Sequence, residues 1–173
     1  SVSAAQCNTL ASAYLFYLVR PLEAWTLLSN VSMKLQLLFG NQSRIPLQWR
    51  ELSVRLYWNA LLYESDLLAE LDLPHSGIVH FEELVDLPGD FEEEDDEDED
   101  GDNDIVDDSG YHDAGDAPVG RDELWYFLAE IALRRLLNRV SHMIYQKDSS
   151  LTLTSLGPIV SELDFQLSQW YEN

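Results

Sequence analysis

The stretch that decides the fold is Trp125–Tyr145, WYFLAEIALRRLLNRVSHMIY. Apolar residues recur in it every three or four positions, which is the period of an α-helix with one buried face. The pattern predicts one long helix that runs from Asp122, as its N-cap, to about Gln146. Its expected buried stripe comprises Leu124, Phe127, Leu128, Ile131, Leu136, Val140 and Ile144.

The same period on both sides of this stretch predicts further helices over 3–19, 21–40, 46–71 and 158–171. Pro21 suits the first turn of the second helix, where its missing N–H costs nothing, and Gly40 suits a left-handed cap at its end. Two helices joined by so short a turn lie antiparallel. The expected fold class is therefore all-α: antiparallel helical hairpins packed as a bundle or short solenoid. We expect one helical domain over 1–173, as a fragment of a larger region.

These patterns also predict which side chains are buried. The apolar side of the first helix includes Cys7, which we expect to be a buried structural thiol. We expect the tryptophans to be core residues rather than a cofactor cage. After the third helix, which Pro74 and Gly77 end, the irregular segment 75–90 is expected to pack on the helices through its apolar residues. The expected core positions in these segments are Cys7, Leu10, Ala11, Tyr14, Leu15, Leu18; Ala24, Trp25, Leu28, Val31, Leu35, Leu38; Leu52, Leu56, Tyr57, Trp58, Asn59, Leu61, Leu62, Tyr63; Ile78, Phe81, Leu84, Leu87; Ile159, Leu163, Gln166, Leu167 and Trp170.

The acidic residues are concentrated in one segment. The 173 residues carry a net charge of −22, and 16 of the 32 acidic residues lie between Asp90 and Asp116, where there is no Lys or Arg. The rest has 16 acidic and 10 basic residues, a net charge of −6. Such a segment is too repulsive and too poor in apolar groups to order itself, so we expect a disordered acidic loop at about 90–118.

Composition excludes several function classes. The net negative charge argues against direct nucleic-acid binding, because neutralising phosphates requires clustered Lys and Arg. The single cysteine, Cys7, excludes an internal disulfide and any multi-cysteine metal site. No apolar run is long enough to span a membrane, so no membrane partner is expected.

The acidic segment contains one metal-like pattern. Asp96, Asp98, Asp100, Gly101, Asp104 and Asp107 occupy positions of an EF-hand loop, but the last is Asp rather than a bidentate Glu and no amphipathic helix precedes it. The aspartate-rich magnesium site of a helical prenyl-diphosphate enzyme needs carboxylates held rigidly on a helix, and Asp95 and Asp96 lie in a segment without fixed geometry. We therefore expect a solvated acidic run, with no metal or cofactor site. No nucleophile–base arrangement is evident, so we expect no catalytic activity.

Arg134, Arg135 and Arg139 form the only basic cluster. Glu130 precedes Arg134 by four residues, the favourable order for an intrahelical ion pair worth about 0.3–0.5 kcal/mol. The alternative is an arginine that reaches buried carbonyls or a carboxylate such as Glu64 and fixes the helix register.

Four blocks, 1–38, 51–74, 125–145 and 161–173, together resemble the regulatory middle homology region of fungal Zn(2)-Cys(6) binuclear cluster transcription factors. The family pattern departs at Val54, where it usually has the first of two adjacent arginines, and at Asp72, where it has glycine. The matching motif residues are Trp25, Arg55, Trp58, Pro74, Glu130, Arg134, Arg135, Arg139 and Trp170.

The resemblance implies a nuclear regulatory domain that controls RNA polymerase II transcription through the transcription machinery or regulatory proteins. It also implies a parent protein whose N-terminal six-cysteine cluster holds two zinc ions, contacts DNA and often dimerises. None of those six cysteines is present, so DNA binding by this chain would be indirect and it would hold no cofactor. A small-molecule effector is compatible with the family. The alternative is a helical-repeat adaptor of tetratricopeptide type, which the hairpin with Pro21 and Trp25 suggests but the missing repeat of about 34 residues opposes.

Overall fold

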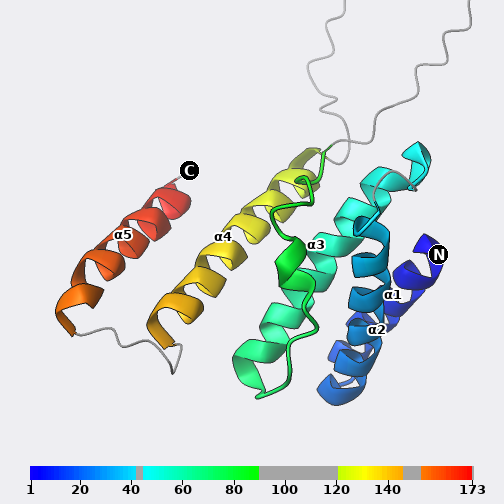
Figure 1. Cartoon of the computed structure of the whole chain (residues 1–173), viewed down its shortest axis with the longest axis horizontal. Helices are drawn as coiled ribbons and strands as arrows, with labels where there is room; N and C mark the ends of the chain where they lie inside the picture. Colours follow the sequence, from blue (N-terminus) through cyan, green and yellow to red (C-terminus); the bar gives the residue numbers. More distant parts are fainter. Residues whose placement is uncertain (42–44, 90–120, 146–152, 173) are drawn as a thin grey trace, which may run out of the picture.

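The helices predicted from periodicity are present in the structure, a computed structural model that describes residues 1–41, 45–89, 121–145 and 153–172 (Figure 1). The elements are α1 (Val2–Tyr17), α2 (Pro21–Phe39), α3 (Leu47–Glu70), the short 3-10 helix η2 (Ile78–Phe81), α4 (Arg121–Tyr145) and α5 (Leu153–Glu172). No strand occurs in these described ranges, and the all-α prediction is confirmed. The expected acidic loop at 90–118, with its EF-hand-like aspartates, lies outside the described residues.

Local signals explain most helix ends. The Ser1 hydroxyl accepts a hydrogen bond from the Ala4 N–H at 3.4 Å and caps α1. Pro21 opens α2, as predicted. The left-handed cap predicted at Gly40 is wrong, because Gly40 has φ −62° and its N–H continues the helical pattern to the Gln36 carbonyl at 2.9 Å. At the other end of the chain, α4 begins at Arg121, so Asp122 is not its N-cap, and α5 begins before Pro158, which lies inside the helix.

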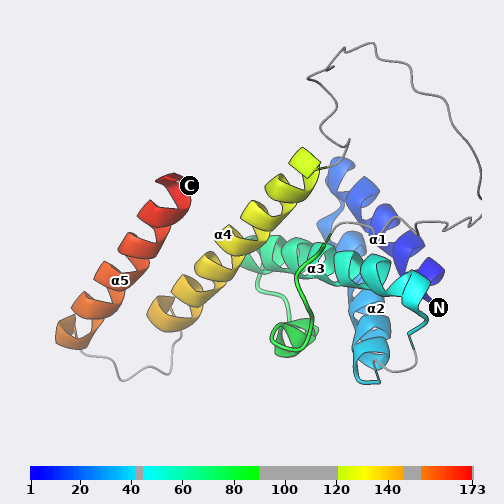
Figure 2. The ribbon, with the colours of Figure 1, turned by 90° about the horizontal axis from the view of Figure 1, so that it is seen from above.

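The helices form a row rather than a closed bundle. The hairpin of α1 and α2 packs on α3, α4 packs on the far side of α3, and α5 packs mainly on α4. Figures 1 and 2 show this order from two directions, with α5 and the α1–α2 hairpin at opposite ends. Of the two arrangements that the sequence left open, the row corresponds to the short solenoid.

The core lies between α2 and α3 and is centred on aromatic rings. The rings of Phe39 and Tyr57 lie 5.6 Å apart, and those of Tyr57 and Trp58 lie 5.3 Å apart, both edge to face. This is the favourable geometry for aromatic pairs. The fully buried residues around them include Leu28, Val31, Leu35, Ala60 and Ile78. Most of the core predicted for α2 and α3 is thus confirmed.

The face predicted to be buried on α1 is wrong. Leu10 and Tyr14 are 65% and 63% exposed, and the Cys7 thiol is exposed as well. The buried side consists instead of Val2 and the small residues Ala5, Thr9 and Ser12. Small residues allow the backbones of α1 and α2 to approach closely, and the Ser12 hydroxyl lies 3.4 Å from the Ala24 carbonyl across that interface. Larger side chains on this side of α1 would force the two helices apart.

Four further burial predictions are wrong. Trp125, Leu84, Leu87 and Leu167 are each more than two-fifths exposed. Leu84 and Leu87 lie after η2, outside the helices. For Trp125 and Leu167, the reason is that α5 packs mainly on α4 and the row is one helix thick there, so each of these two helices can bury only a narrow stripe. Ile131, Leu136 and Leu163 provide that stripe, as predicted.

The turn that joins α3 to η2 contains Gly77. Its φ of 86° lies in the left-handed region, so we expect Gly77→Ala to destabilise the fold by about 1–2 kcal/mol. Gly157 lies inside α5 with open space around its Cα, and Gly157→Ala should stabilise by about 0.5–1 kcal/mol. Urea unfolding followed by circular dichroism measures both changes. Effects of the same sign would contradict the assigned backbone conformations.

Candidate functional site

The segment 72–89, here called the connector, is bound along α3 by buried polar groups. Glu64 of α3 is 4% exposed, and its carboxylate accepts hydrogen bonds from the N–H and the hydroxyl of Ser76 at 2.5 and 2.8 Å. The Tyr57 hydroxyl donates to the Ile78 carbonyl at 3.1 Å, and the Trp58 Nε1–H donates to the Asp86 carbonyl at 2.8 Å. Core residues of α3 therefore also position the connector.

The end of the connector is held by an ion pair of α3. Arg55 and Glu51 form an i, i+4 pair at 2.8 Å. Arg55 also donates to the Gly89 carbonyl at 2.6 Å, and the Gly89 N–H donates to Glu51 at 3.2 Å. Gly89 is the last described residue before the acidic stretch, so the motif arginine Arg55 fixes the end of the described connector.

The three arginines of α4 contact three different elements. Arg134 forms an ion pair with Asp66 of α3, and Arg139 donates to the Gln166 side chain of α5 at 2.8 Å. Arg135 pairs with Glu82 of the connector at 2.5 Å, and its guanidinium lies 5.9 Å from the centre of the Trp58 ring. A cation over an aromatic face at this distance is attracted by the ring quadrupole. The arginines thus join α4 to both of its neighbours.

Both partners predicted for these arginines are wrong. Arg134 bonds Asp66 rather than Glu130, which is exposed, and Glu64 bonds Ser76 rather than an arginine. The more general prediction, that an arginine of this cluster binds a carboxylate on another element, is confirmed. The carboxylates that the arginines bind are the exposed one of Asp66 and the partly buried one of Glu82, instead of that of Glu64.

The remaining motif residues also have structural positions. The Trp170 Nε1–H of α5 donates to the Ala129 carbonyl of α4 at 3.0 Å. Trp25 packs against the core and is partly buried. Pro74 is exposed just beyond the end of α3. Apart from the exposed Pro74 and Glu130, the motif residues therefore lie at contacts between elements, and they do not converge on one cavity.

Two tyrosines have shifted acidities. Burial raises the pKa of the Tyr57 hydroxyl far above its ordinary value, and the nearby Glu82 carboxylate raises it further. Burial also raises the pKa of Tyr63, with an added contribution from Glu130. Both phenols therefore stay protonated at neutral pH, where the Tyr57 hydroxyl donates its hydrogen bond to Ile78. This suits a structural donor and not a general base.

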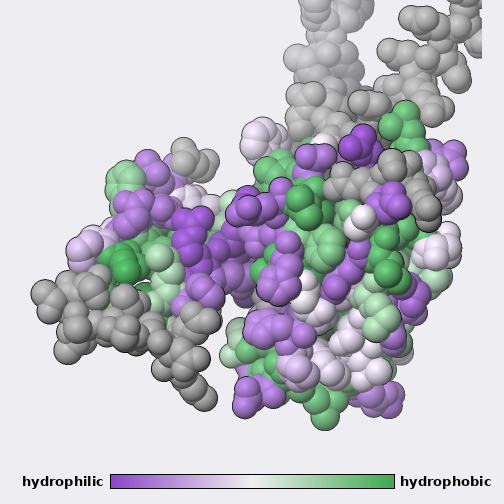
Figure 3. All heavy atoms as spheres, in the orientation of Figure 1, coloured by the Kyte–Doolittle hydropathy of each residue, from purple (hydrophilic) through white to green (hydrophobic). Residues whose placement is uncertain are grey.

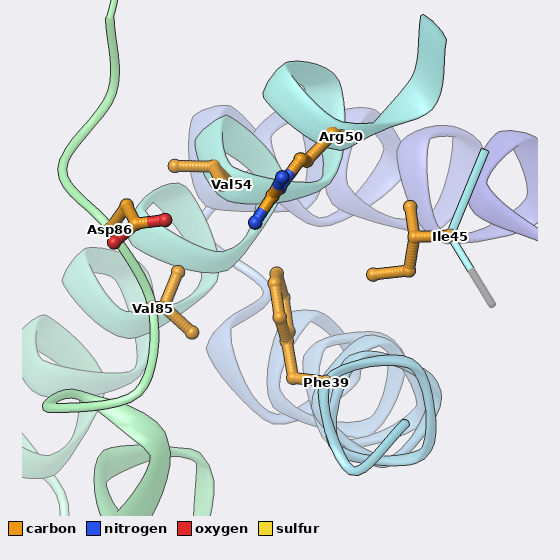
Figure 4. Close-up of a pocket in the computed structure, with 6 residues that line it drawn as sticks. All are labelled: Phe39, Ile45, Arg50, Val54, Val85 and Asp86. Atoms are coloured by element: carbon orange, nitrogen blue, oxygen red, sulfur yellow. The ribbon is translucent and has the colours of Figure 1, made fainter. Parts of the chain in front are cut away.

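Cavities in the described parts are small. One, lined by Phe39 of α2, Arg50 and Val54 of α3 and Val85 of the connector, has a volume of about 10 Å³, room for a single water (Figure 4). A larger groove of about 200 Å³ lies between α4 and α5, where Figure 3 shows hydrophobic surface. An apolar cavity of about 150 Å³ holds benzene, whereas pockets for drug-sized ligands measure roughly 300–1,000 Å³. The groove therefore fits one apolar ring or side chain. It is lined by Leu136, Leu137, Val140, Ile144, Val160, Leu163, Asp164 and Leu167.

No metal centre is found in the described part of the chain, where no three His, Cys, Asp or Glu side chains gather. The zinc cluster implied by the resemblance needs six cysteines, and the only cysteine of this chain is Cys7, so the residues present do not fit it. Among the described helices, none has the length and apolar character required to cross a bilayer.

Comparison of the chain with models of protein families, with curated proteins and with solved structures gave no match.

Proposed function

We propose that this chain is the regulatory helical domain of a fungal zinc-cluster transcription factor. It acts in the nucleus on RNA polymerase II transcription, contacts DNA only through the zinc module of its parent protein, and has no catalytic activity. Its partners are the transcription machinery or regulatory proteins.

One observation carries the proposal: most of the residues that match the family motifs join one element to another. Arg55 and Trp58 bind the connector, and Trp170 binds α4. Arg134 and Arg135 bind α3 and the connector. If the motif residues hold the elements together, a change in their contacts can cover or expose an activation surface. This is the kind of regulation that we propose.

The α4–α5 hairpin is the part of the domain that can most easily separate from α3 and the connector. Its contacts with the rest include the apolar side chains of Ile131 and Phe127. They also include the polar bonds of Arg134, Arg135 and Asn138, the last to Ser65 at 3.1 Å. Surface ion pairs contribute only about 0–1 kcal/mol each. A contact of this strength can be opened by a partner at small cost, whereas the core between α2 and α3 cannot.

A reporter assay tests this function. Residues 1–173 are placed between a zinc-cluster DNA-binding module and an activation segment, and transcription is measured. We expect the chain to change reporter output relative to the same fusion without it. The double variant Arg134→Ala/Arg135→Ala should shift output by about fivefold, because two lost ion pairs change the held-to-released ratio by roughly 1 kcal/mol.

Arg20→Ala is the matched control, because Arg20 pairs only locally with Glu23 in the described structure. It should leave reporter output unchanged. Output that is insensitive to the presence of the chain would contradict a regulatory role. Equal effects of Arg20→Ala and of the α4 double variant would contradict release of the hairpin.

The row of helices also favours the second candidate, a helical-repeat adaptor, because such proteins stack hairpins side by side (Figure 2). The encoding gene separates the two functions. Six closely spaced cysteines upstream of Ser1 support the transcription factor, and tandem hairpins support the adaptor.

A further inference from the structure

The outer face of α1 is apolar where surface helices are normally charged. Its exposed positions Ser3, Cys7, Leu10, Tyr14 and Tyr17 follow one another in alternating steps of four and three residues. This is the heptad spacing that lines one seam of a helix and pairs it with another helix. The sequence pattern that failed to predict the core of α1 is therefore a real apolar stripe, and it faces outward.

This stripe carries no charge. None of the 16 residues of α1 is Asp, Glu, Lys or Arg. A surface helix usually presents charged residues on the side opposite the core, so an uncharged outer side is the pattern of a helix covered on both sides. The stripe continues into the turn and the start of α2, where the exposed apolar residues are Leu18, Val19 and Leu22.

The exposed area matches a protein interface. Tyr17 is 89% exposed, and a tyrosine contributes roughly 150–250 Å² when it is buried. With Leu10, Tyr14 and the turn residues, the face offers an area on the order of the 800 Å² that each partner of a standard interface buries. Interfaces are enriched in tyrosine and depleted of charge at their centre, as this face is.

The charge pattern indicates the occupant. A charged partner would find no counter-charge on α1, whereas the rest of the chain, with its net charge of −22, would attract such a partner elsewhere. An uncharged heptad stripe packs best against another uncharged heptad stripe. The α1 helix of a second copy of this chain provides such a stripe. A two-fold axis lets the same patch serve both partners, which is the commonest symmetry of soluble oligomers.

We propose that the outer face of α1 is a self-association surface, on which α1 of one copy pairs with α1 of a second copy in a two-fold dimer. The pairing does not depend on the transcriptional function.

Sedimentation velocity of the full 173-residue chain over a concentration series tests the dimer. Tyr14→Glu and Leu10→Glu should each raise the dimer dissociation constant by roughly thirtyfold, the effect of removing a central interface residue. The matched controls are Tyr171→Glu on α5 and Leu37→Glu on α2, which replace residues of the same two types that are at least as exposed but lie outside the face. They should leave the dissociation constant unchanged. Circular dichroism verifies that all four variants stay folded. Added salt should strengthen the dimer, because it screens the repulsion between two acidic chains.

Cross-linking provides a second readout that does not rely on substitution in the face. Cys7 is the only cysteine, so a short bismaleimide can join two copies only through Cys7 of each. We expect a covalent dimer with the natural chain and with Leu37→Glu, and none with Leu10→Glu or Cys7→Ser. A chain that stays monomeric at all concentrations overturns the proposal. So does a dimer that resists the α1 substitutions or dissociates with Leu37→Glu, and so does open-ended growth into larger oligomers.

Discussion

Trp58→Ala is expected to remove about 3–5 kcal/mol of stability, the largest loss from any single truncation proposed for this chain. Trp58 is 1% exposed, contacts the Tyr57 ring edge to face, lies under the Arg135 guanidinium and donates to the Asp86 carbonyl. Truncation therefore leaves a cavity and an unpaired carbonyl at once. Because small domains are stable by only about 5–15 kcal/mol, urea unfolding should show a much lower midpoint or no folded baseline.

Trp125→Ala is the matched control, because Trp125 is 66% exposed and truncation there should change stability by no more than about 0.5 kcal/mol. Trp58→Phe separates the two causes of the loss. It keeps an aromatic ring in the core but removes the Nε1–H together with part of the indole volume, so it should cost less than the alanine variant, which removes the whole ring. A loss from Trp58→Ala no greater than that from Trp125→Ala would contradict the position of Trp58 in the core.

Periodicity predicted the parts of the fold in which polar and apolar residues alternate clearly. In α2 and α4, residues such as Leu28, Leu35 and Ile131 recur at helical spacing on one side, and charged or polar residues interrupt the other side, so the period indicates the buried face. In α1 no residue is charged, and apolar residues lie on every side of the helix. The spacing of apolar residues therefore fits the exposed side as well as the buried side and cannot distinguish them. The buried side was chosen by close backbone approach, which depends on Ser12 and Ala24 and leaves no strong signal in one sequence.

The partners of the arginines could not be predicted from spacing alone. The i, i+4 rule compares only residues of one helix, and it favoured Glu130 for Arg134. The actual partner, Asp66, lies on another helix and comes within reach only after α4 has packed on α3. The position of Glu64 in the sequence does indicate its structural role. It stands between Leu61 and Leu67 on the buried side of α3, and a carboxylate in such a stripe requires hydrogen-bond donors from another segment.

Glu64→Ala is expected to destabilise the chain by about 3 kcal/mol, the second largest effect. The substitution removes the acceptor for two donors, the N–H and the hydroxyl of Ser76, at a site where Glu64 is almost completely buried. An unsatisfied buried donor costs about 1–3 kcal/mol, and the missing side-chain volume adds to the loss. Urea unfolding measures the total, and hydrogen exchange at the Ser76 and Ile78 amides should show faster local opening of the connector.

Ser76→Ala removes only the hydroxyl and should cost about 1 kcal/mol, since the N–H of residue 76 still reaches the carboxylate. The double variant should then cost less than the sum of the single ones, because Glu64 and Ser76 share one contact. Glu70→Ala, at an exposed position of the same helix, serves as the control and should be nearly neutral. If Glu64→Ala were as mild as Glu70→Ala, or additive with Ser76→Ala, the contact between Glu64 and Ser76 would not hold the connector on α3. The hydrogen bonds of Tyr57, Trp58 and Arg55 would then hold it.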